Sequence, residues 1–218
     1  MVAKTTPTKT AVIIGGTGLI GSALVSQIET YSQYARAKSL TRRRVITQGK
    51  VETICVNFSD PDSYAEHVHG DVLFSCMGTT KKQAGSIAAQ RLVDVDYQLE
   101  VAGLAAKNGV RHYCLVSSSG ADASSRNDYM KMKGDLEAAV TALPFERVSI
   151  FQPSLLVGPR PEFRFAELVG EPILSLITKI PSLQKYRPIP GAQVAQKMLE
   201  TSLLDETGLR VFKLDEIF

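Results

Sequence analysis

Along most of the chain, short apolar runs alternate with segments whose apolar residues recur every three or four positions. The apolar runs lie at 11–14, 37–41, 51–58, 72–76, 113–116 and 147–151, with a last one near 209–214. Helical periodicity is found at 18–29, 87–107, 129–143 and 192–204. Continuous apolar strands separated by amphipathic helices are typical of a parallel sheet covered on both faces. The pattern therefore predicts an α/β protein, and a length of 218 residues favours a single domain.

A glycine cluster follows the first apolar run. Gly16, Gly18 and Gly21 have G-x-G-x-x-G spacing, and Gly15 adds a second, overlapping pattern. Such glycines allow a sharp turn, a close approach of the backbone to a pyrophosphate and tight packing of the next helix. A strand before and a helix after the cluster indicate a Rossmann-type, doubly wound parallel sheet that binds a dinucleotide; the alternative is a glycine-rich turn without a ligand. The expected contacts are Gly15, Thr17, Gly18, Leu19, Ile20 and Gly21.

The end of the second strand indicates which dinucleotide is bound. Proteins that prefer NAD place an acidic residue here, where it binds the ribose 2′-hydroxyl. This chain instead reads Thr41-Arg42-Arg43-Arg44, and a guanidinium group binds a 2′-phosphate through charge-assisted bonds. We therefore expect NADP(H), with Arg42 as the first contact and Arg43 as the second. A solvated basic loop is the alternative.

Two further strand ends are expected to contact the cofactor. Asn57 and Phe58 follow the third strand and should lie near the adenine, and Asp60-Pro61 should begin a short helix with Asp60 as its N-cap. The fourth strand leads into a loop with Gly78, which would let the backbone pass close to the ribose, although an ordinary turn fits equally well. The expected contacts in this loop are Cys76, Met77, Gly78 and Thr79.

Hydroxyl and amine side chains gather after the fifth strand. Ser117, Ser118 and Ser119 end that strand, and Tyr129 and Lys133 are spaced four residues apart on one helix face. Reduction of a carbonyl leaves an alkoxide that needs a proton, and a tyrosine beside an ammonium group can supply it. A serine hydroxyl can polarise the carbonyl, and the lysine can also bond the nicotinamide ribose.

These motifs together resemble the short-chain dehydrogenase/reductase superfamily in its atypical or extended division. The segments at 15–21, 75–80, 116–122 and 129–134 resemble the Tat-interactive-protein-like oxidoreductase branch, which includes fungal mitochondrial relatives. The resemblance implies a Rossmann fold, NADPH binding and a catalytic set of Ser118, Tyr129 and Lys133, with Ser117 and Ser119 as adjacent alternatives for the serine. It further implies that Pro153 and Leu155 flank the nicotinamide carboxamide.

The chain departs from this family pattern in two places. Ten residues separate Ser118 from Tyr129, fewer than in most extended members. The asparagine that many members add to the proton relay is not evident, and Asp94 and Asp96 lie in the corresponding helix. These differences concern the path of the proton.

The two ends of the chain complete the predicted domain. Residues 1–10 are expected to be a flexible N-terminus, and residues 11–218 to form the NAD(P)-binding domain. Within it, residues of about 159–208 are expected to form a small C-terminal cap on the substrate side. A helix predicted at 163–180 lines the substrate pocket in one interpretation and packs as ordinary core in the other.

Composition excludes several other classes of protein. A net charge of +3 with interleaved signs shows no nucleic-acid footprint, and no apolar run is long enough for a membrane span. Three cysteines without C-x-x-C spacing argue against disulfides and a metal site and favour buried thiols, so we expect a cytoplasmic protein. The three histidines are expected to be packing or surface residues.

The leading functional hypothesis is an NADPH-dependent oxidoreductase that acts on a small carbonyl or alcohol, with Tyr129 as acid and base. The alternative is an NADPH-binding regulatory or scaffold protein with little or no catalysis, and a third hypothesis is isomerase or epimerase chemistry with a retained cofactor. The substrate remains unspecified by the sequence, and both a monomer and a homodimer are compatible with it.

Overall fold

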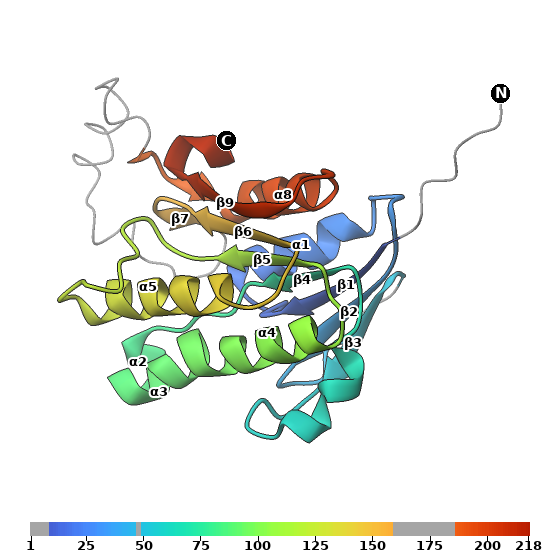
Figure 1. Cartoon of the computed structure of the whole chain (residues 1–218), viewed down its shortest axis with the longest axis horizontal. Coiled ribbons are helices and arrows are strands. Elements are labelled where there is room, and N and C mark those ends of the chain that lie inside the picture. Colours follow the sequence, from blue (N-terminus) through green and yellow to red (C-terminus); the bar gives the residue numbers. More distant parts are fainter. Residues whose placement is uncertain (1–8, 47–48, 159–185) are drawn as a thin grey trace.

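A seven-stranded parallel sheet forms the centre of the molecule (Figure 1). The computed structural model describes residues 9–46, 49–158 and 186–218. The strand order β3-β2-β1-β4-β5-β6-β9 and the helices on both faces confirm the predicted single α/β domain of Rossmann type. Its strands are β1 (Lys9–Ile14), β2 (Tyr34–Thr41), β3 (Val51–Cys55), β4 (Val72–Ser75), β5 (His112–Val116), β6 (Arg147–Gln152) and β9 (Gly208–Lys213).

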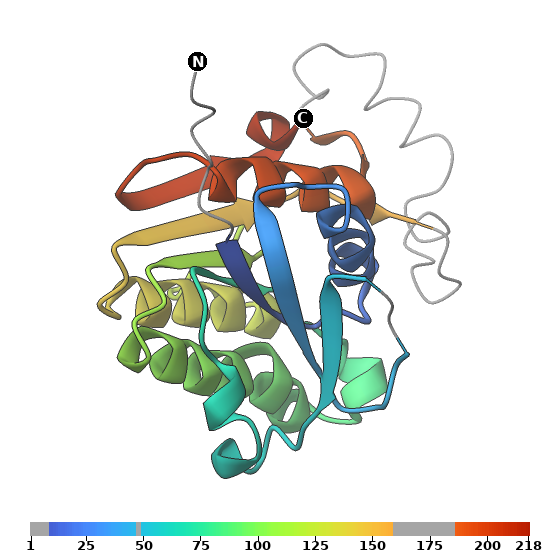
Figure 2. The same cartoon turned by 90° about the vertical axis from the view of Figure 1, so that its right-hand side faces the viewer.

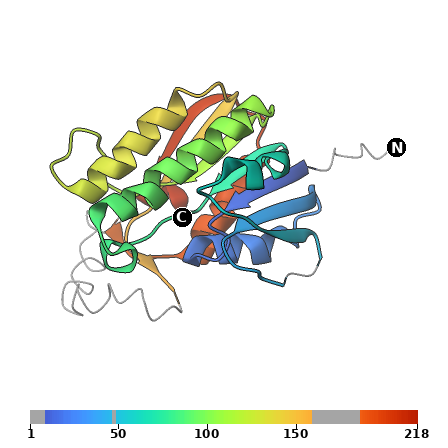
Figure 3. The same cartoon turned by 90° about the horizontal axis from the view of Figure 1, so that it is seen from below.

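Two helical layers cover the sheet, as Figure 2 and Figure 3 show. Each layer has its own hydrophobic core, because successive side chains of a strand point to opposite faces. Ala11 and Ile13 of β1 join one core, whereas Val12 and Ile14 join the other. The first layer contains α1 (Leu19–Ile28) and α8 (Gly191–Ser202), and the second contains α3 (Ile87–Arg91), η3 (Leu92–Asp96), α4 (Tyr97–Lys107) and α5 (Asp128–Thr141).

Short elements fill the connections. Leu156–Val157 (β7) and Ile189–Pro190 (β8) pair in parallel as a separate two-stranded sheet. The others are η1 (Pro61–Ser63), η2 (Ala65–His67), α2 (Lys81–Ala84) and η5 (Leu214–Ile217).

The order in which strands are added to the sheet reverses at β1. Strands β2 and β3 are added on one side of β1, and β4, β5, β6 and β9 on the other. Because every strand is parallel, all carboxyl ends lie at one edge, and ligands of such sheets bind where the order reverses. The turn after β1 therefore lies at the position that Rossmann-type proteins use for a nucleotide.

Four local expectations are corrected by the structure. The helix predicted at 87–107 contains a π-helical segment, η3, between two α-helical parts. The third strand ends at Cys55 and not at residue 58, because Ser63 binds the backbone of Asn57 and turns the chain. Cys55 is exposed on this edge strand and not buried, and the Asp60 side chain forms no cap hydrogen bond.

The predicted cap is described only from residue 186 onward. Residues 159–185, including the helix expected at 163–180, and residues 1–8 lie outside the described residues. Within the expected range of the cap, α8 packs beside α1 in the helical layer that covers the sheet. This helix is thus a part of the central fold.

His112 is a buried histidine at the start of β5. Its Nε2 lies 2.9 Å from Ser149 Oγ, and only 7% of its surface is exposed. Burial, reinforced by the charges of Arg147 and Lys9, lowers the pKa of His112 to about 3. The unfolded chain takes up a proton on this imidazole near pH 6.5. The folded protein keeps the imidazole neutral at that pH.

We predict that this histidine makes the protein less stable in mild acid. The unfolded state binds a proton near pH 6.5 and the folded state does not, so the free energy of unfolding falls by about 2 kcal/mol between pH 7 and pH 5. His112→Gln should remove this part of the pH dependence in urea unfolding. His69→Gln, a change near the surface, is the control, and an unchanged pH slope in His112→Gln would contradict the assignment.

Candidate functional site

The turn after β1 lies directly against the end of β4. Gly15 has a φ of +76°, and a Cβ atom on it would lie 2.4 Å from the carbonyl carbon of Cys76. A Cβ atom on Gly21 would lie 2.1 Å from the Gly15 carbonyl oxygen. Glycine at both positions is what allows β1, β4 and α1 to converge at the edge of the sheet.

The first turn of α1 faces this edge with its backbone. Gly18 is the N-cap and provides no side-chain cap, and no acidic residue occupies the first turn. The amides of a helix's first turn have no partner within the helix, so they are donors for an anion. Ile20 is buried in the core, so it can reach a ligand only through its backbone, whereas Leu19 is half-buried and packs against Gly158.

Arg42, Arg43 and Arg44 lie exposed at the end of β2, next to this turn. The Thr41 hydroxyl donates a 2.7 Å hydrogen bond to the Arg43 carbonyl oxygen and holds the bend in which they lie. Within the described part of the chain, no carboxylate forms an ion pair with any of the three. Their guanidinium groups are placed to meet an anion from solvent.

The segment after β3 provides fewer side-chain contacts for an adenine than the sequence suggested. Phe58 is buried between Tyr64 and Tyr97, with ring centroids 5.7 and 6.0 Å away, so its side chain belongs to the core. Asn57 is exposed, and its Oδ1 accepts a hydrogen bond from the Ser59 amide. An adenine at this position would therefore contact Asn57 and the Phe58 backbone.

A buried carboxylate holds the loop after β4. Asp94, in η3, is fully buried and accepts a 2.8 Å hydrogen bond from the Thr79 amide. Gln90 donates 3.2 Å bonds to both the Thr79 carbonyl oxygen and Asp94 Oδ2. Gly78 is exposed, so the loop presents its backbone at the edge, whereas Met77 is buried.

The role of Asp94 was missed by the sequence analysis, which noted it only as a helix residue. The signal was a carboxylate among apolar residues of a core-facing helix, because a buried charge requires partners. Its partners are the Thr79 backbone amide, which leaves no pattern in the sequence, and the Gln90 side chain four residues earlier. Asp94 thus fixes the conformation of the loop at Thr79.

Tyr129 and Lys133 lie at the start of α5, at the same edge of the sheet. Asn127 caps this helix by accepting hydrogen bonds from the amides of Tyr129 and Met130, at 3.0 and 3.1 Å. Lys133 is 4% exposed, and its Nζ lies 5.8 Å from the centroid of the Tyr129 ring. The predicted pair therefore lies together on one face, as the spacing of four residues requires.

A glycine in α5 allows the short connection from Ser118 to Tyr129. A Cβ atom on Gly134 would lie 2.1 Å from the Ala123 nitrogen, so the loop lies directly on the helix. The Asp122 amide also donates to the Met130 carbonyl oxygen at 3.1 Å. This close packing brings the end of β5 and the start of α5 together over ten residues.

The serines after β5 point in different directions. Ser117, an alternative for the catalytic serine and a candidate cofactor contact, is buried, and its hydroxyl donates to Glu137 on α5 and is therefore engaged within the protein. Ser118 is the next residue and half-buried, and its hydroxyl has a weak 3.4 Å contact with the Ser119 carbonyl oxygen. Of the two, only Ser118 has a hydroxyl without a strong partner.

The segment after β6 completes the edge. The Ser119 amide donates to the Pro153 carbonyl oxygen at 3.1 Å, and the Ile189 amide donates to Leu155 at 2.8 Å. Further along, a Cβ atom on Gly158 would lie 2.2 Å from Leu19 Cδ1. The segment thus runs from the serines to the glycine turn.

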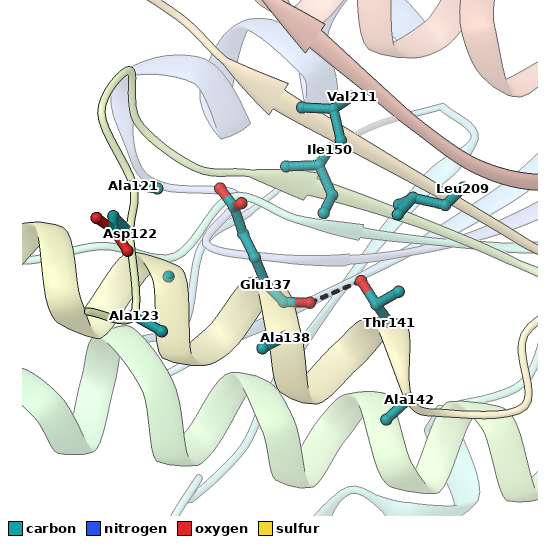
Figure 4. A pocket seen from close by; sticks show the side chains of 11 residues that line it. Ala121, Asp122, Ala123, Glu137, Ala138, Thr141, Ala142, Ile150, Leu209 and Val211 are labelled. Atoms are coloured by element: carbon teal, nitrogen blue, oxygen red, sulfur yellow. Dashed lines mark hydrogen bonds between the residues drawn. The ribbon is translucent and has the colours of Figure 1, made fainter. Parts of the chain in front are cut away.

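A groove of about 480 Å³ lies elsewhere, between α5 and the strands β6 and β9 (Figure 4). Its walls are mostly alanines and aliphatic side chains, among them Ile150, Leu209 and Val211. Glu137 extends from α5 toward the sheet at its side. The groove is on the flank of α5 and does not include the glycine turn.

The strand-end loops, the glycine turn and the Tyr129–Lys133 pair define a Rossmann-type nucleotide-binding protein. A family model described as NAD(P)H-binding matches residues 15–143. Protein HTATIP2 of Rattus norvegicus is 37% identical over 92% of this chain and 84% of its own length. The mitochondrial protein FMP52 of Coccidioides immitis is 38% identical over 74% of this chain and 72% of its own length.

Solved structures show the same fold. MoeE5 in complex with UDP-glucose and NAD has a TM-score of 0.72 and 15% identity, covering 95% of this chain and 79% of its own. A short-chain dehydrogenase family protein from Francisella tularensis has a TM-score of 0.69 and 14% identity, covering 94% and 96%. The chain belongs to the NAD(P)H-binding family of atypical short-chain dehydrogenase/reductases, which confirms the resemblance noted in the sequence.

The comparisons also correct the expected cytoplasmic location. Relatives from Coccidioides immitis, Eremothecium gossypii and Saccharomyces cerevisiae are named as mitochondrial proteins. Composition and the cysteine count, on which the expectation rested, do not distinguish these compartments. Among the helices of the described residues, none has the length and apolar character needed to cross a membrane.

We predict that Gly134→Ala disturbs the loop between Ser118 and Tyr129. The new methyl group would overlap the backbone at Ala123, which should lower the free energy of unfolding by about 1–3 kcal/mol. Gly103→Ala in α4 is the matched control, because nothing lies within 4 Å of its Cβ position. That change should raise stability by about 1 kcal/mol. Equal effects of the two variants in thermal unfolding would contradict the packing described.

Proposed function

We propose that the protein is an NADPH-dependent oxidoreductase that reduces a small carbonyl compound or oxidises the corresponding alcohol. The observation on which this proposal depends is the Tyr129–Lys133 pair, held at the edge of the sheet where the glycine turn lies. A proton donor beside a nicotinamide site is the arrangement that carbonyl reduction needs. Solved neighbours with the same fold contain NAD, which supports a nicotinamide cofactor.

The residues of the glycine turn fit a dinucleotide. The α1 amides would bind the pyrophosphate, since Gly18 leaves this helix end without a side-chain cap. The loop held by Asp94 would lie along a ribose at Gly78 and Thr79, and Pro153 and Leu155 would flank the nicotinamide. When bound, the reduced nicotinamide supplies a hydride. The proposed contacts are Gly15, Thr17, Gly18, Leu19, Ile20, Gly21, Arg42, Arg43, Asn57, Phe58 through its backbone, Cys76, Met77, Gly78, Thr79, Tyr129, Lys133, Pro153 and Leu155.

The three catalytic residues would have separate roles. The Ser118 hydroxyl donates a hydrogen bond to the substrate oxygen and orients the carbonyl. The Tyr129 hydroxyl donates its proton to that oxygen as it becomes an alkoxide. Lys133 is buried on the same face, with its Nζ 5.8 Å from the centroid of the Tyr129 ring, and would bond the nicotinamide ribose. In the oxidation of an alcohol the phenolate takes the proton back.

We predict that Arg42→Ala weakens NADPH binding selectively. Loss of a charge-assisted contact with the 2′-phosphate should raise the Kd for NADPH by about 10–100-fold, since each tenfold corresponds to about 1.4 kcal/mol. The Kd for NADH, which lacks this phosphate, should change less than about threefold on the same principle. Titration that follows nicotinamide fluorescence measures both constants.

Arg36→Ala is the matched control for charge, because Arg36 is exposed on the same strand but near its amino end. It should leave the ratio of the two constants unchanged. If Arg42→Ala also leaves this ratio unchanged, the proposed preference for NADPH is wrong.

We predict that Tyr129→Phe still binds NADPH but loses turnover. Removal of a general acid usually lowers kcat by about 10²–10⁴-fold. A screen of aldehydes, ketones and quinones with the wild-type protein identifies the substrate, and the variant is then compared on it. Equal turnover by the variant would exclude this mechanism. Tight NADPH binding by a wild-type protein that turns over no compound would favour the regulatory alternative.

A further inference from the structure

Glu137 joins the helix of the proposed catalytic pair to two strand ends. Its carboxylate accepts a hydrogen bond from the Ser117 hydroxyl at the end of β5. Both carboxylate oxygens also accept from Gln152 Nε2, the last residue of β6, at 2.9 and 3.0 Å. Ser117 and Gln152 are buried and Glu137 is half-buried beside the groove of Figure 4. One carboxylate therefore binds three elements of the fold together.

The position of Glu137 along α5 makes this contact relevant to the site. Tyr129, Lys133 and Glu137 are spaced four residues apart, so they lie in a row on one face of the helix. The strand ends that Glu137 binds lead directly to Ser118 and to Pro153. A shift or rotation of α5 at Glu137 would therefore change where Tyr129 lies relative to Ser118.

The chemistry of the three groups makes the contact specific. An ionised carboxylate is only an acceptor, and it is matched here with a hydroxyl and an amide NH₂ group. Charge-assisted hydrogen bonds are roughly twice as strong as neutral ones, and the two donors are buried, so a lost acceptor would leave them unsatisfied. Neither an amide nor a shorter acid at position 137 would provide the same set of acceptors.

We infer that Glu137 is the positioning residue that sets the proposed proton donor Tyr129 against Ser118, by binding the ends of β5 and β6 to α5. The inference rests on the proposed function for the identity of the reacting groups. Glu137 itself touches neither the substrate nor the cofactor in this scheme. It acts through Ser117 and Gln152.

An exchange of the two partners tests this role. Glu137→Gln replaces one of the two acceptor oxygens by an NH₂ donor. Gln152→Glu places two carboxylates side by side. The double variant E137Q/Q152E again pairs an amide with a carboxylate, with the same total charge. Glu66→Gln is the control for charge, because it removes an exposed carboxylate on η2.

The first measurement is amide hydrogen exchange of the full-length protein, followed by mass spectrometry. We expect exchange of peptides covering 117–120 and 129–134 to rise at least tenfold in Gln152→Glu and by a smaller factor in Glu137→Gln. Peptides from β1 and β4 should change less than twofold. The double variant should return to within threefold of the wild type. A double variant no better than the worse single variant, or a uniform rise over the whole sheet, would overturn the inference.

The second measurement is turnover with the substrate found for the wild-type protein. We expect kcat to fall at least tenfold in each single variant and to recover in the double variant, while the Kd for NADPH stays within twofold. A purely structural contact would not produce this separation of kcat from cofactor binding. If the wild-type protein has no turnover, the proposed function fails, and the exchange experiment still decides whether Glu137 holds α5 to the strand ends.

Discussion

The close approach of the Gly15 turn to the end of β4 is the contact on which the rest of the edge depends. At this point the order of strands reverses, and two loops that leave the sheet in opposite directions have to pass each other with their backbones almost touching. A side chain at Gly15 would separate β1 from β4, and one at Gly21 would separate α1 from the turn. The glycines are thus needed for the fold itself, before any nucleotide is considered.

Much of this arrangement could be predicted from the sequence, because the relevant signals are local. Alternating apolar runs and amphipathic segments identify a parallel sheet, and the glycines between the first strand and helix mark its reversal point. The spacing of Tyr129 and Lys133 likewise places them on one helix face. Such patterns need no knowledge of distant parts of the chain.

The features that could not be predicted are those that depend on contacts between distant segments. Asp94 binds a backbone amide of the preceding loop, and the Ser117 hydroxyl binds Glu137, which lies twenty residues later in the sequence. Phe58 follows a strand that ends three residues earlier than its apolar run suggested, so its ring enters the core. In each case tertiary packing selects one of several orientations that the local pattern allows.

The packing of Leu19 has a consequence for the order in which the protein forms. Leu19 lies in the first turn of α1, yet its side chain is covered by Gly158 and by Gly191 at the start of α8. These residues are synthesised long after the glycine turn, and contacts between segments so far apart in sequence form slowly. A nascent chain that has already completed β1, α1 and β2 would still expose Leu19 at its nucleotide turn. The glycine turn is therefore fully packed only after α8 (Gly191–Ser202) has folded against α1, so that a chain without α8 would lack the finished site.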